Sequence, residues 1–330
     1  MRWWFLFGTV LLLILVHLLS GSVFIPPGQI ITILTGGTAE NPAWHDLVLF
    51  YRLPKALTAL LAGSALSLSG LLMQTFFRNP LAGPDVLGLS AGASLFVALL
   101  VMTGSFFPFP EGEASVLAAA FGGCALVFFI MTLVAHYLKD SAALLITGLM
   151  VGALVSALVS VLHFVSRAEL QQYFFMWSMG SLGHLNFSEL TWLTACVAGG
   201  SMLAMGLTKA TNAWLLGENY AQSMGIAINR TRLLIIICTS ILTGAVTAFC
   251  GPIAFVGIAV PHITRLVFKT SNHKVLIPGV LLTGAALMLI CDLAAQLPGN
   301  ARILPINVVT ALVGAPVVIW VIIRSKKTWV

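Results

Sequence analysis

The sequence predicts an all-α protein built from about ten helices that cross a membrane. Hydrophobic residues make up 59% of the 330 residues and charged residues only 8%, whereas soluble domains carry about 25% charged residues. Apolar runs of about 20 residues, the length that spans hydrocarbon, recur along the whole chain with short connections. Because this leaves no room for a soluble domain, we expect a single transmembrane domain over residues 1–330.

The apolar runs give the expected helices in order. They cover residues 3–20, 56–77, 86–103, 115–138, 142–164, 189–207, 232–250, 253–268, 275–294 and 306–323. The first run follows Arg2 as in a signal peptide, but it lacks an A-x-A cleavage pattern. Since Trp3 and Trp4 suit a membrane interface, we expect this run to be retained as the first helix.

The connections carry Lys and Arg unevenly. If the N-terminus is cytoplasmic, the outer connections hold only Arg52, Lys55, Arg167 and Arg302, and the remaining twelve of the 16 basic residues lie on the cytoplasmic side. Cytoplasmic connections of membrane proteins are enriched in this way, so both termini are predicted to be cytoplasmic. The positive net charge then follows from topology and contact with membrane lipid, and it requires no nucleic-acid partner.

Several patterns restrict the chemistry of the chain. The five cysteines stand singly, which predicts neither a disulfide framework nor a zinc site, and no second ligand accompanies His262. The nucleotide-binding pattern G-x-x-x-x-G-K-[ST] is absent, so the chain is not expected to be an ATPase. GLSAG at 88–92 matches a nucleophile elbow without the strand which that motif requires. Ser90 is therefore not expected to be catalytic, and Gly88 and Gly92, one turn apart, indicate close helix packing.

Two long connections remain, near 165–188 on the outer side and 208–231 on the cytoplasmic side. The second is too polar to span a membrane, yet it has apolar residues at helical spacing and glycine breaks at Gly217 and Gly225. We expect two short surface helices there. Because the segment lacks the Lys-rich face of a membrane-surface anchor, its expected ligand is a partner protein.

Glycines and prolines interrupt the apolar pattern in two stretches, RNPLAGPDVLGLSAGA at 78–93 and GPIAFVGIAVPHITRL at 251–266. An unpaired backbone N–H or C=O in hydrocarbon costs several kcal/mol, so such breaks are tolerated only beside other helices or a water-filled path. They therefore indicate a transport route.

Several motifs together resemble those of the FecCD family, the permease subunits of ABC importers for ferric siderophores, haem and cobalamin. From about Arg52 to the C-terminus they are RLPK at 52–55, Gly63, Gly70, Gln74, the two interrupted stretches, MWSMGSL at 176–182, LLGENYAQSMGI at 215–226, Asp292 and LPINVVTALVGAPVVIW at 304–320.

The resemblance implies a permease of ten transmembrane helices in a bacterial cytoplasmic (inner) membrane. It also implies a second permease subunit, identical or paralogous, two ATPase subunits that hold ATP and Mg, and a periplasmic or lipid-anchored substrate-binding protein. No cofactor is expected on this chain. The expected cargo is a metal chelate, with a ferric siderophore preferred and haem or cobalamin as alternatives.

The resemblance also implies a docking site for the binding protein and a coupling site for the ATPase. The residues implied to dock the binding protein are Arg52, Lys55 and Arg302, and Gln296 stands where some relatives have a basic residue. The alternative for Arg52 and Lys55 is a basic helix end at a membrane interface, with Pro54 at the start of the helix. Coupling falls to Leu216, Gly217, Glu218, Ala221, Met224 and Gly225.

A cytoplasmic gate is implied at Asn79 and Leu81, with a second part at Ser141 and Ala142. The alternative for the first part is a tight turn in which Asn79 and Asp85 cap helix ends. The fifth expected span carries small residues at helical spacing, Gly148, Gly152, Ser156 and Ser160. These predict either a pathway lining at the subunit interface or tight packing within one subunit.

An ion-coupled secondary transporter is the rival class, and it would need intramembrane acids or unwound backbone sites for an ion. Asp292 is the main candidate acid, and we expect it to be paired because it lies near the outer end of an apolar span. An intramembrane enzyme would rest only on GLSAG and single histidines. Ile303 and Asn307 depart from the family pattern near the last span.

Overall fold

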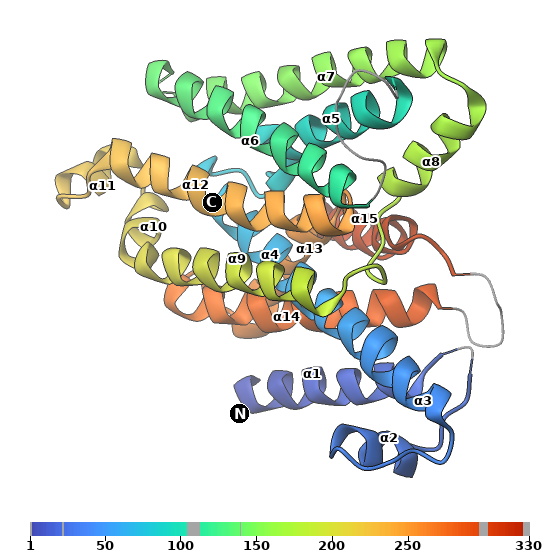
Figure 1. Cartoon of the computed structure of the whole chain (residues 1–330). Helices are drawn as coiled ribbons and strands as arrows, with labels where there is room; N and C mark the ends of the chain where they lie inside the picture. The colour runs from blue at the N-terminus through green and yellow to red at the C-terminus, as the bar shows by residue number, and fades with distance from the viewer. Residues whose placement is uncertain (1, 22, 104–112, 139, 297–302, 326–330) are drawn as a thin grey trace.

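The computed structural model describes residues 2–21, 23–103, 113–138, 140–296 and 303–325, and within these ranges the chain forms helices and no strand (Figure 1). The elements are α1 (Arg2–Leu19), α2 (Pro27–Leu34), α3 (Pro42–Asp46), the π-helical turn η1 (Leu47–Arg52), α4 (Leu53–Phe76), the 3₁₀ turn η2 (Pro84–Leu87), α5 (Leu89–Thr103), α6 (Glu113–Tyr137), α7 (Ser141–Val165), α8 (Ala168–Ser178), α9 (Phe187–Gly206), α10 (Thr208–Trp214), α11 (Glu218–Ser223), α12 (Ile228–Cys250), α13 (Val256–Phe268), α14 (His273–Ala295) and α15 (Ile306–Ser325).

The all-α membrane fold is confirmed, and the lengths of its helices differ. In the described part of the chain 6 helices are long and apolar enough to cross a membrane, or 7 if α9 and α10 form one span bent by 59°. α5, α13 and α15 are shorter apolar helices, of 10–17 residues. Each expected run falls on one of these helices. α5 and α13 are short because glycine and proline breaks occupy the backbone just before them.

Helix α4 lies at the centre of the bundle and packs against α9, α12, α13 and α14. Two glycines allow the closest of these approaches. A Cβ at Gly63 would overlap the backbone oxygen of Gly284 on α14, and a Cβ at Gly70 would overlap that of Gly257 on α13. In a membrane, where apolar side chains gain little by leaving lipid, such backbone proximity is a main source of helix association.

A second group of helices, α5, α6 and α7, packs mainly on itself and joins the central helices through α12 (Figure 1). In the figure these three helices run along the top of the molecule, and α8 descends from the end of α7. α7 packs mainly against α5, with η2 and α6 beside it, and its last turns meet α8, where the rings of His163 and Phe174 lie 5.4 Å apart. It is therefore a peripheral helix of this subunit.

The chain before α4 differs from the expectation that Pro54 opens a helix. The helix begins at Pro42 as α3 and continues through η1 into α4. A proline has no N–H to donate and crowds the preceding turn, and the wider π-helical turn accommodates it. Arg52 thereby becomes an internal residue of one long helix, Pro42–Phe76.

α1 packs along α14 as part of the bundle. Its Arg2 donates from Nη1 to the carbonyl oxygen of Phe268, at 3.2 Å, at the end of α13. The helix bundle has two ends, which are named here because the functional site is described by them. The α11 end holds α10, α11, the last turn of α4 and the first turns of α12 and α14, and the α8 end holds α3, α8 and the first turn of α4 (Figure 1, left and right).

Candidate functional site

Helix α10 is anchored inside the bundle at the α11 end. Trp214 is fully buried, its indole Nε1–H donates to the carbonyl oxygen of Phe76 at 3.2 Å, and the two rings lie 5.7 Å apart. The sequence indicated a surface helix here; α10 does lie at the surface, with Lys209 exposed, but its opposite face is buried in the bundle. The burial of this face could have been predicted from Trp214, since a large aromatic ring with one polar atom commonly serves as a buried anchor.

A polar chain fixes α10 to α14 and α4 as well. Asn212 Oδ1 accepts the backbone N–H of His273 at 2.8 Å, and it lies 3.0 Å from His273 Nδ1. The other ring nitrogen of His273 lies 2.7 Å from Thr75 Oγ1 on α4. The last turn of α4, α10 and the first turn of α14 therefore form one connected corner.

Helix α11 projects beyond this corner between two glycines with left-handed backbone. Gly217 has φ of +108° and Gly225 of +81°, a conformation that other residues adopt only with strain. Leu216 and Met224 are exposed, whereas Ala221 is fully buried. Of the predicted coupling residues, Leu216 and Met224 are thus available to a partner, and Ala221 instead packs the hairpin against the bundle.

An ion pair connects α11 to α12. Arg232 is buried, and its Nη2 lies 3.3 Å from both carboxylate oxygens of Glu218. Its Nη1 donates to the carbonyl oxygen of Leu138, at 2.9 Å, just after the end of α6. Beside the pair lies a depression of about 590 Å³, lined by Glu218, Gln222, Ile226, Ala227, Ile228, Asn229, Arg230 and Arg232.

The loop after α4, with the predicted gate residues Asn79 and Leu81, is held from both sides. Asn79 Oδ1 accepts the backbone N–H of Leu81 at 2.9 Å, which forms a turn within the loop and not a helix cap. His262 donates from Nε2 to the carbonyl oxygen of Pro80 at 2.8 Å, so this histidine ties α13 to the loop. Asp85 does not cap a helix either, because it accepts the hydroxyl of Ser90.

The second predicted gate segment lies at the start of α7. Asp140 caps this helix, since its carboxylate accepts the backbone N–H groups of Ala142 and Ala143 at 3.2 and 3.1 Å. Ser141 is the first helical residue, and Ala142 is exposed. Both predicted gate segments therefore belong to the α11 end, one after α4 and one before α7.

Helix α7 presents three faces because successive residues are offset by about 100°. Leu144, Gly148 and Val155 are buried and form the face toward this subunit, where a Cβ at Gly148 would overlap the carbonyl oxygen of Val86. Gly148 thus packs within this subunit, as the second of the two alternatives expected.

The small face of α7, defined as Gly152, Ser156 and Ser160, is open in this subunit. Ser156 and Ser160 are exposed, and a Cβ at Gly152 would meet nothing within 4 Å. The large apolar side chains of Met150, Leu154 and Val161 lie on the opposite side of the helix and are also exposed. One exposed face of α7 therefore suits lipid, and the small face suits a second protein surface or a pathway.

At the α8 end the predicted docking residue Arg52 is buried, with 7% exposure. Its guanidinium donates to the carbonyl oxygen of Leu18 at 2.7 Å and also to that of Val23. These bonds satisfy carbonyls at and beyond the end of α1, which have no partners within the helix. Arg52 thus fastens α1 to α4 in this structure, while Arg302 lies outside the described residues.

Lys55, the second predicted docking residue, belongs to a cluster around Asp292. The buried Asp292 Oδ2 lies 2.6 Å from His17 Nε2 and 3.1 Å from Lys55 Nζ, and it accepts the side-chain N–H of Gln296 at 2.9 Å. The partner that Asp292 was expected to have is therefore a set of three groups from α1, α4 and the end of α14. Sequence reasoning missed His17, since a single histidine in an apolar run gives no sign of its partner.

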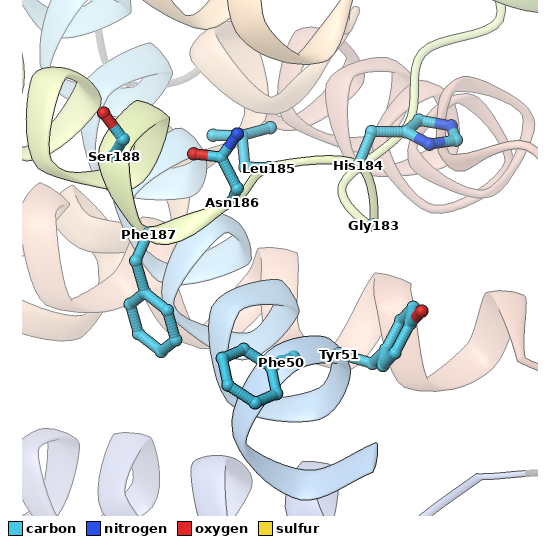
Figure 2. Close-up of a pocket in the computed structure, with 8 residues that line it drawn as sticks. All are labelled: Phe50, Tyr51, Gly183, His184, Leu185, Asn186, Phe187 and Ser188. Carbon is cyan, nitrogen blue, oxygen red and sulfur yellow. The ribbon is translucent and has the colours of Figure 1, made fainter. Parts of the chain in front are cut away.

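Beside Lys55 the surface is hollowed by a depression of about 410 Å³ (Figure 2). Exposed aromatic side chains form its wall, with the rings of Phe50 and Phe187 in an edge-to-face contact at 6.3 Å. A Cβ at Gly183 would lie 3.8 Å from Lys55 Cδ, which places the ion cluster next to the depression. The lining residues are Phe50, Tyr51, Gly183, His184, Leu185, Asn186, Phe187 and Ser188.

These features define the class of protein. A bundle of membrane-length helices with broken helices at its core and a helical projection at one end is the architecture of a transporter permease. Residues 9–324 match the FecCD transport family, and the chain belongs to this family.

Curated relatives and a solved structure agree with the assignment. The hemin transport system permease protein HmuU of Yersinia pestis is 34% identical over 318 residues, covering 96% of this chain and 95% of that protein. The vitamin B12 import system permease protein BtuC of Klebsiella pneumoniae is 36% identical, over 98% of this chain and 94% of that protein. A structure described as an inward-facing metal-chelate type ABC transporter matches with a TM-score of 0.84 at 27% identity, covering 98% of this chain and 99% of that one.

The PsaBC structure from Streptococcus pneumoniae, in complex with Fab, covers 83% of this chain and 92% of that one, with a TM-score of 0.52 at 15% identity. This likeness concerns the fold alone. The family match and the curated relatives together make the chain a permease of the FecCD transport family, similar over nearly its whole length to permease proteins of hemin and vitamin B12 transport systems.

Proposed function

We propose that this protein is the membrane subunit of a binding-protein-dependent ABC importer in a bacterial cytoplasmic membrane. In this assembly ATP and Mg are held by two separate ATPase subunits, and a second permease subunit completes the pathway. The single observation that supports the proposal most is the match to the FecCD transport family over residues 9–324, nearly the whole length of the chain.

The α11 end is proposed to face the cytoplasm, with both termini on that side. The exposed basic residues of this end, Lys209, Arg230 and Lys274, support this orientation, since cytoplasmic connections are enriched in Lys and Arg. α11, with exposed Leu216 and Met224, is then the projection that contacts an ATPase. A rigid helix suits this role better than a flexible loop, because it transmits a movement of its partner without absorbing it.

The α8 end is proposed to face the binding protein. Because Arg52 is occupied with backbone carbonyls and Lys55 with Asp292, the aromatic depression beside Lys55 is the better available surface at this end. Exposed aromatic side chains are typical of the centres of protein interfaces. Lys55, ion-paired with Asp292 and with a side-chain exposure of 17%, lies beside this surface.

The cargo is proposed to be a metal chelate that passes between two copies of α7 or between α7 and a paralogue. A ferric siderophore is the cargo preferred from the sequence, whereas the relatives of highest similarity reported above are named for hemin and vitamin B12. Their identity over nearly the full chain makes hemin and cobalamin the first compounds to test beside a ferric siderophore.

The proposal is tested by transport into vesicles that contain this permease with its ATPase and the binding protein outside. We expect uptake of one of the three chelates that requires ATP and the binding protein and persists when ion gradients are abolished by ionophores. Uptake that follows an ion gradient without ATP would instead assign the chain to ion-coupled transport. Vesicles with an ATPase variant in which the lysine of the nucleotide-binding pattern G-x-x-x-x-G-K-[ST] is replaced serve as the control.

A further inference from the structure

We infer that the α10–α11 segment is joined to both gate loops by two buried side chains, Trp214 and Arg232, which act as positioning residues for gate movement. This inference rests on the proposed function. The family resemblance places an ATPase contact on α11 and a gate in each loop, whereas the two links come from the contacts of this structure.

The first link runs from α10 to the loop after α4. Trp214 donates its indole N–H to Phe76, the last residue of α4, and is fully enclosed there. Carbonyl groups in the last turn of a helix have no partner within it, so Phe76 offers an acceptor at the point where α4 leaves for its loop. The gate residue Asn79 follows three residues later.

The second link runs from α11 to the loop before α7. Glu218 on α11 pairs with Arg232, and Arg232 donates onward to the carbonyl oxygen of Leu138. The guanidinium presents several N–H groups in fixed directions, so one side chain can bind both partners at once. The gate residue Ser141 follows Leu138 by three residues.

The two links leave the segment on either side of Gly217. Trp214 precedes this glycine and Glu218 follows it, and its φ of +108° marks a sharp change of direction between α10 and α11. Because both links include buried groups, breaking either hydrogen bond without replacement would leave a buried polar group unpaired, which is costly. A displacement of α11 is therefore passed to the helix ends, and each gate loop receives it through its own link.

The test uses the complete complex of permease, ATPase and binding protein in vesicles, with the native cysteines of the permease replaced. Reporter cysteines are introduced as Leu81→Cys or Ala142→Cys, and their reaction with a water-soluble maleimide is measured with and without nucleotide. Each reporter is combined with Trp214→Phe, which keeps an aromatic ring but removes the N–H donor. The other variant is Arg232→Lys, whose single nitrogen cannot take the places of both Nη1 and Nη2 of the guanidinium.

We expect a crossed result. Trp214→Phe should abolish the nucleotide-dependent change of labelling at position 81 and preserve it at position 142, and Arg232→Lys should do the reverse. Chelate uptake should fall about tenfold or more in each variant, the size of a typical coupling between sites, while the ATPase still co-purifies. The control Lys274→Met, at an exposed lysine of the same end, should change neither reporter.

Two results would overturn the inference. One is retention of both labelling changes in both variants, and the other is equal loss at both positions in each variant, which would indicate general loosening. If Arg232→Lys does not fold, Glu218→Gln replaces it, since this partly exposed side chain can be neutralised without emptying the interior. If the unmodified complex neither binds an ATPase nor imports a chelate, the proposed function itself fails, and the inference fails with it.

Discussion

Helices α4 and α7 have nearly the same length, 24 and 25 residues, but opposite surroundings. In the apolar 18-residue segment of the span that contains α4, 83% of the residues are buried within the subunit, against 17% for the corresponding segment of α7, although the α7 segment has the higher mean hydropathy. Lipid is as apolar as leucine, so large apolar side chains give no reason to leave it, whereas small and polar side chains allow helices to approach and to hydrogen-bond. The more polar helix is therefore the interior one.

The comparison also shows what α7 lacks. The polar groups of α4 are satisfied within the subunit, for example Ser69 with Thr243 at 2.7 Å and Ser64 with the carbonyl oxygen of Leu281 at 2.9 Å. The small face of α7 has the composition of such an interior surface but is exposed. This face is therefore the surface of α7 on which the proposed second permease subunit would pack.

The largest effect is expected from Gly70→Leu on α4. The added side chain would meet the backbone of α13 at Gly257, which cannot yield without separating two central helices. We expect a loss of stability of about 3 kcal/mol or more, seen as aggregation of the detergent-solubilised protein on size exclusion. Gly152→Leu on α7 is the matched control and should remain monodisperse. Equal stability of the two variants would contradict the assignment of α4 as the core.

A selective effect on transport is expected from Ser156→Trp on the small face of α7. The isolated subunit has room for this side chain, so its thermal stability should be unchanged. In the assembled importer the tryptophan would overpack the surface against which the small face is proposed to lie, at a cost of about 1–3 kcal/mol. Chelate uptake in vesicles should drop by about tenfold or more. Leu154→Trp, on the opposite side of the same helix, should transport normally, and a defect of equal size there would remove the distinction between the two faces.

A moderate effect on stability is expected from Asp292→Asn. The change keeps the shape but leaves Lys55 without its charged partner in a largely enclosed site, which should cost about 2 kcal/mol. A thermal melt of the purified permease measures the loss, and Asp46→Asn at an exposed site on α3 is the control. Adding Lys55→Met should restore part of the stability. Failure of the second change to restore any would show that the lysine is not paired in solution.

The smallest effect is expected from Arg52→Gln. Loss of the guanidinium bonds to the end of α1 should lower the stability by about 1–2 kcal/mol, measured by the same melt, with the exposed Arg167→Gln unchanged. Titration of the binding protein onto the permease at low and high salt distinguishes the docking role predicted from the sequence. An affinity unaltered by Arg52→Gln supports a fastening role, whereas a lower affinity with a weaker salt dependence supports docking.

The sequence predicted the helices well because apolar length is what a membrane selects. It also located α10 and α11, since polar residues and glycines cannot continue a span. It did not predict the π-helical turn η1 or the buried position of Arg52, because RLPK matches a basic helix end whether its arginine points to water or to a neighbouring helix.

The candidate site was predictable only in part for the same reason. Motif order predicted a gate at Asn79 and Leu81 and a coupling segment, but a pattern along one chain does not say which distant side chains meet. Arg232 was read as one of many cytoplasmic basic residues, and its bonds to Glu218 and Leu138 arise from the packing of three helices. His17 was missed in the same way.

The π-helical turn before α4 makes the length of residues 42–52 as important as their composition. A π-helical turn holds one residue more than an α-helical turn, and Val48 within it is fully buried in a cluster with Ile25, Ile30 and Ile33. A chain shortened by one residue here would close the turn as an α-helix and rotate everything before it by about 100° relative to α4. The residues of α2 and α3 would then lose their contacts in this cluster. Natural variation in this segment is therefore expected to substitute residues freely at the surface while keeping their number constant.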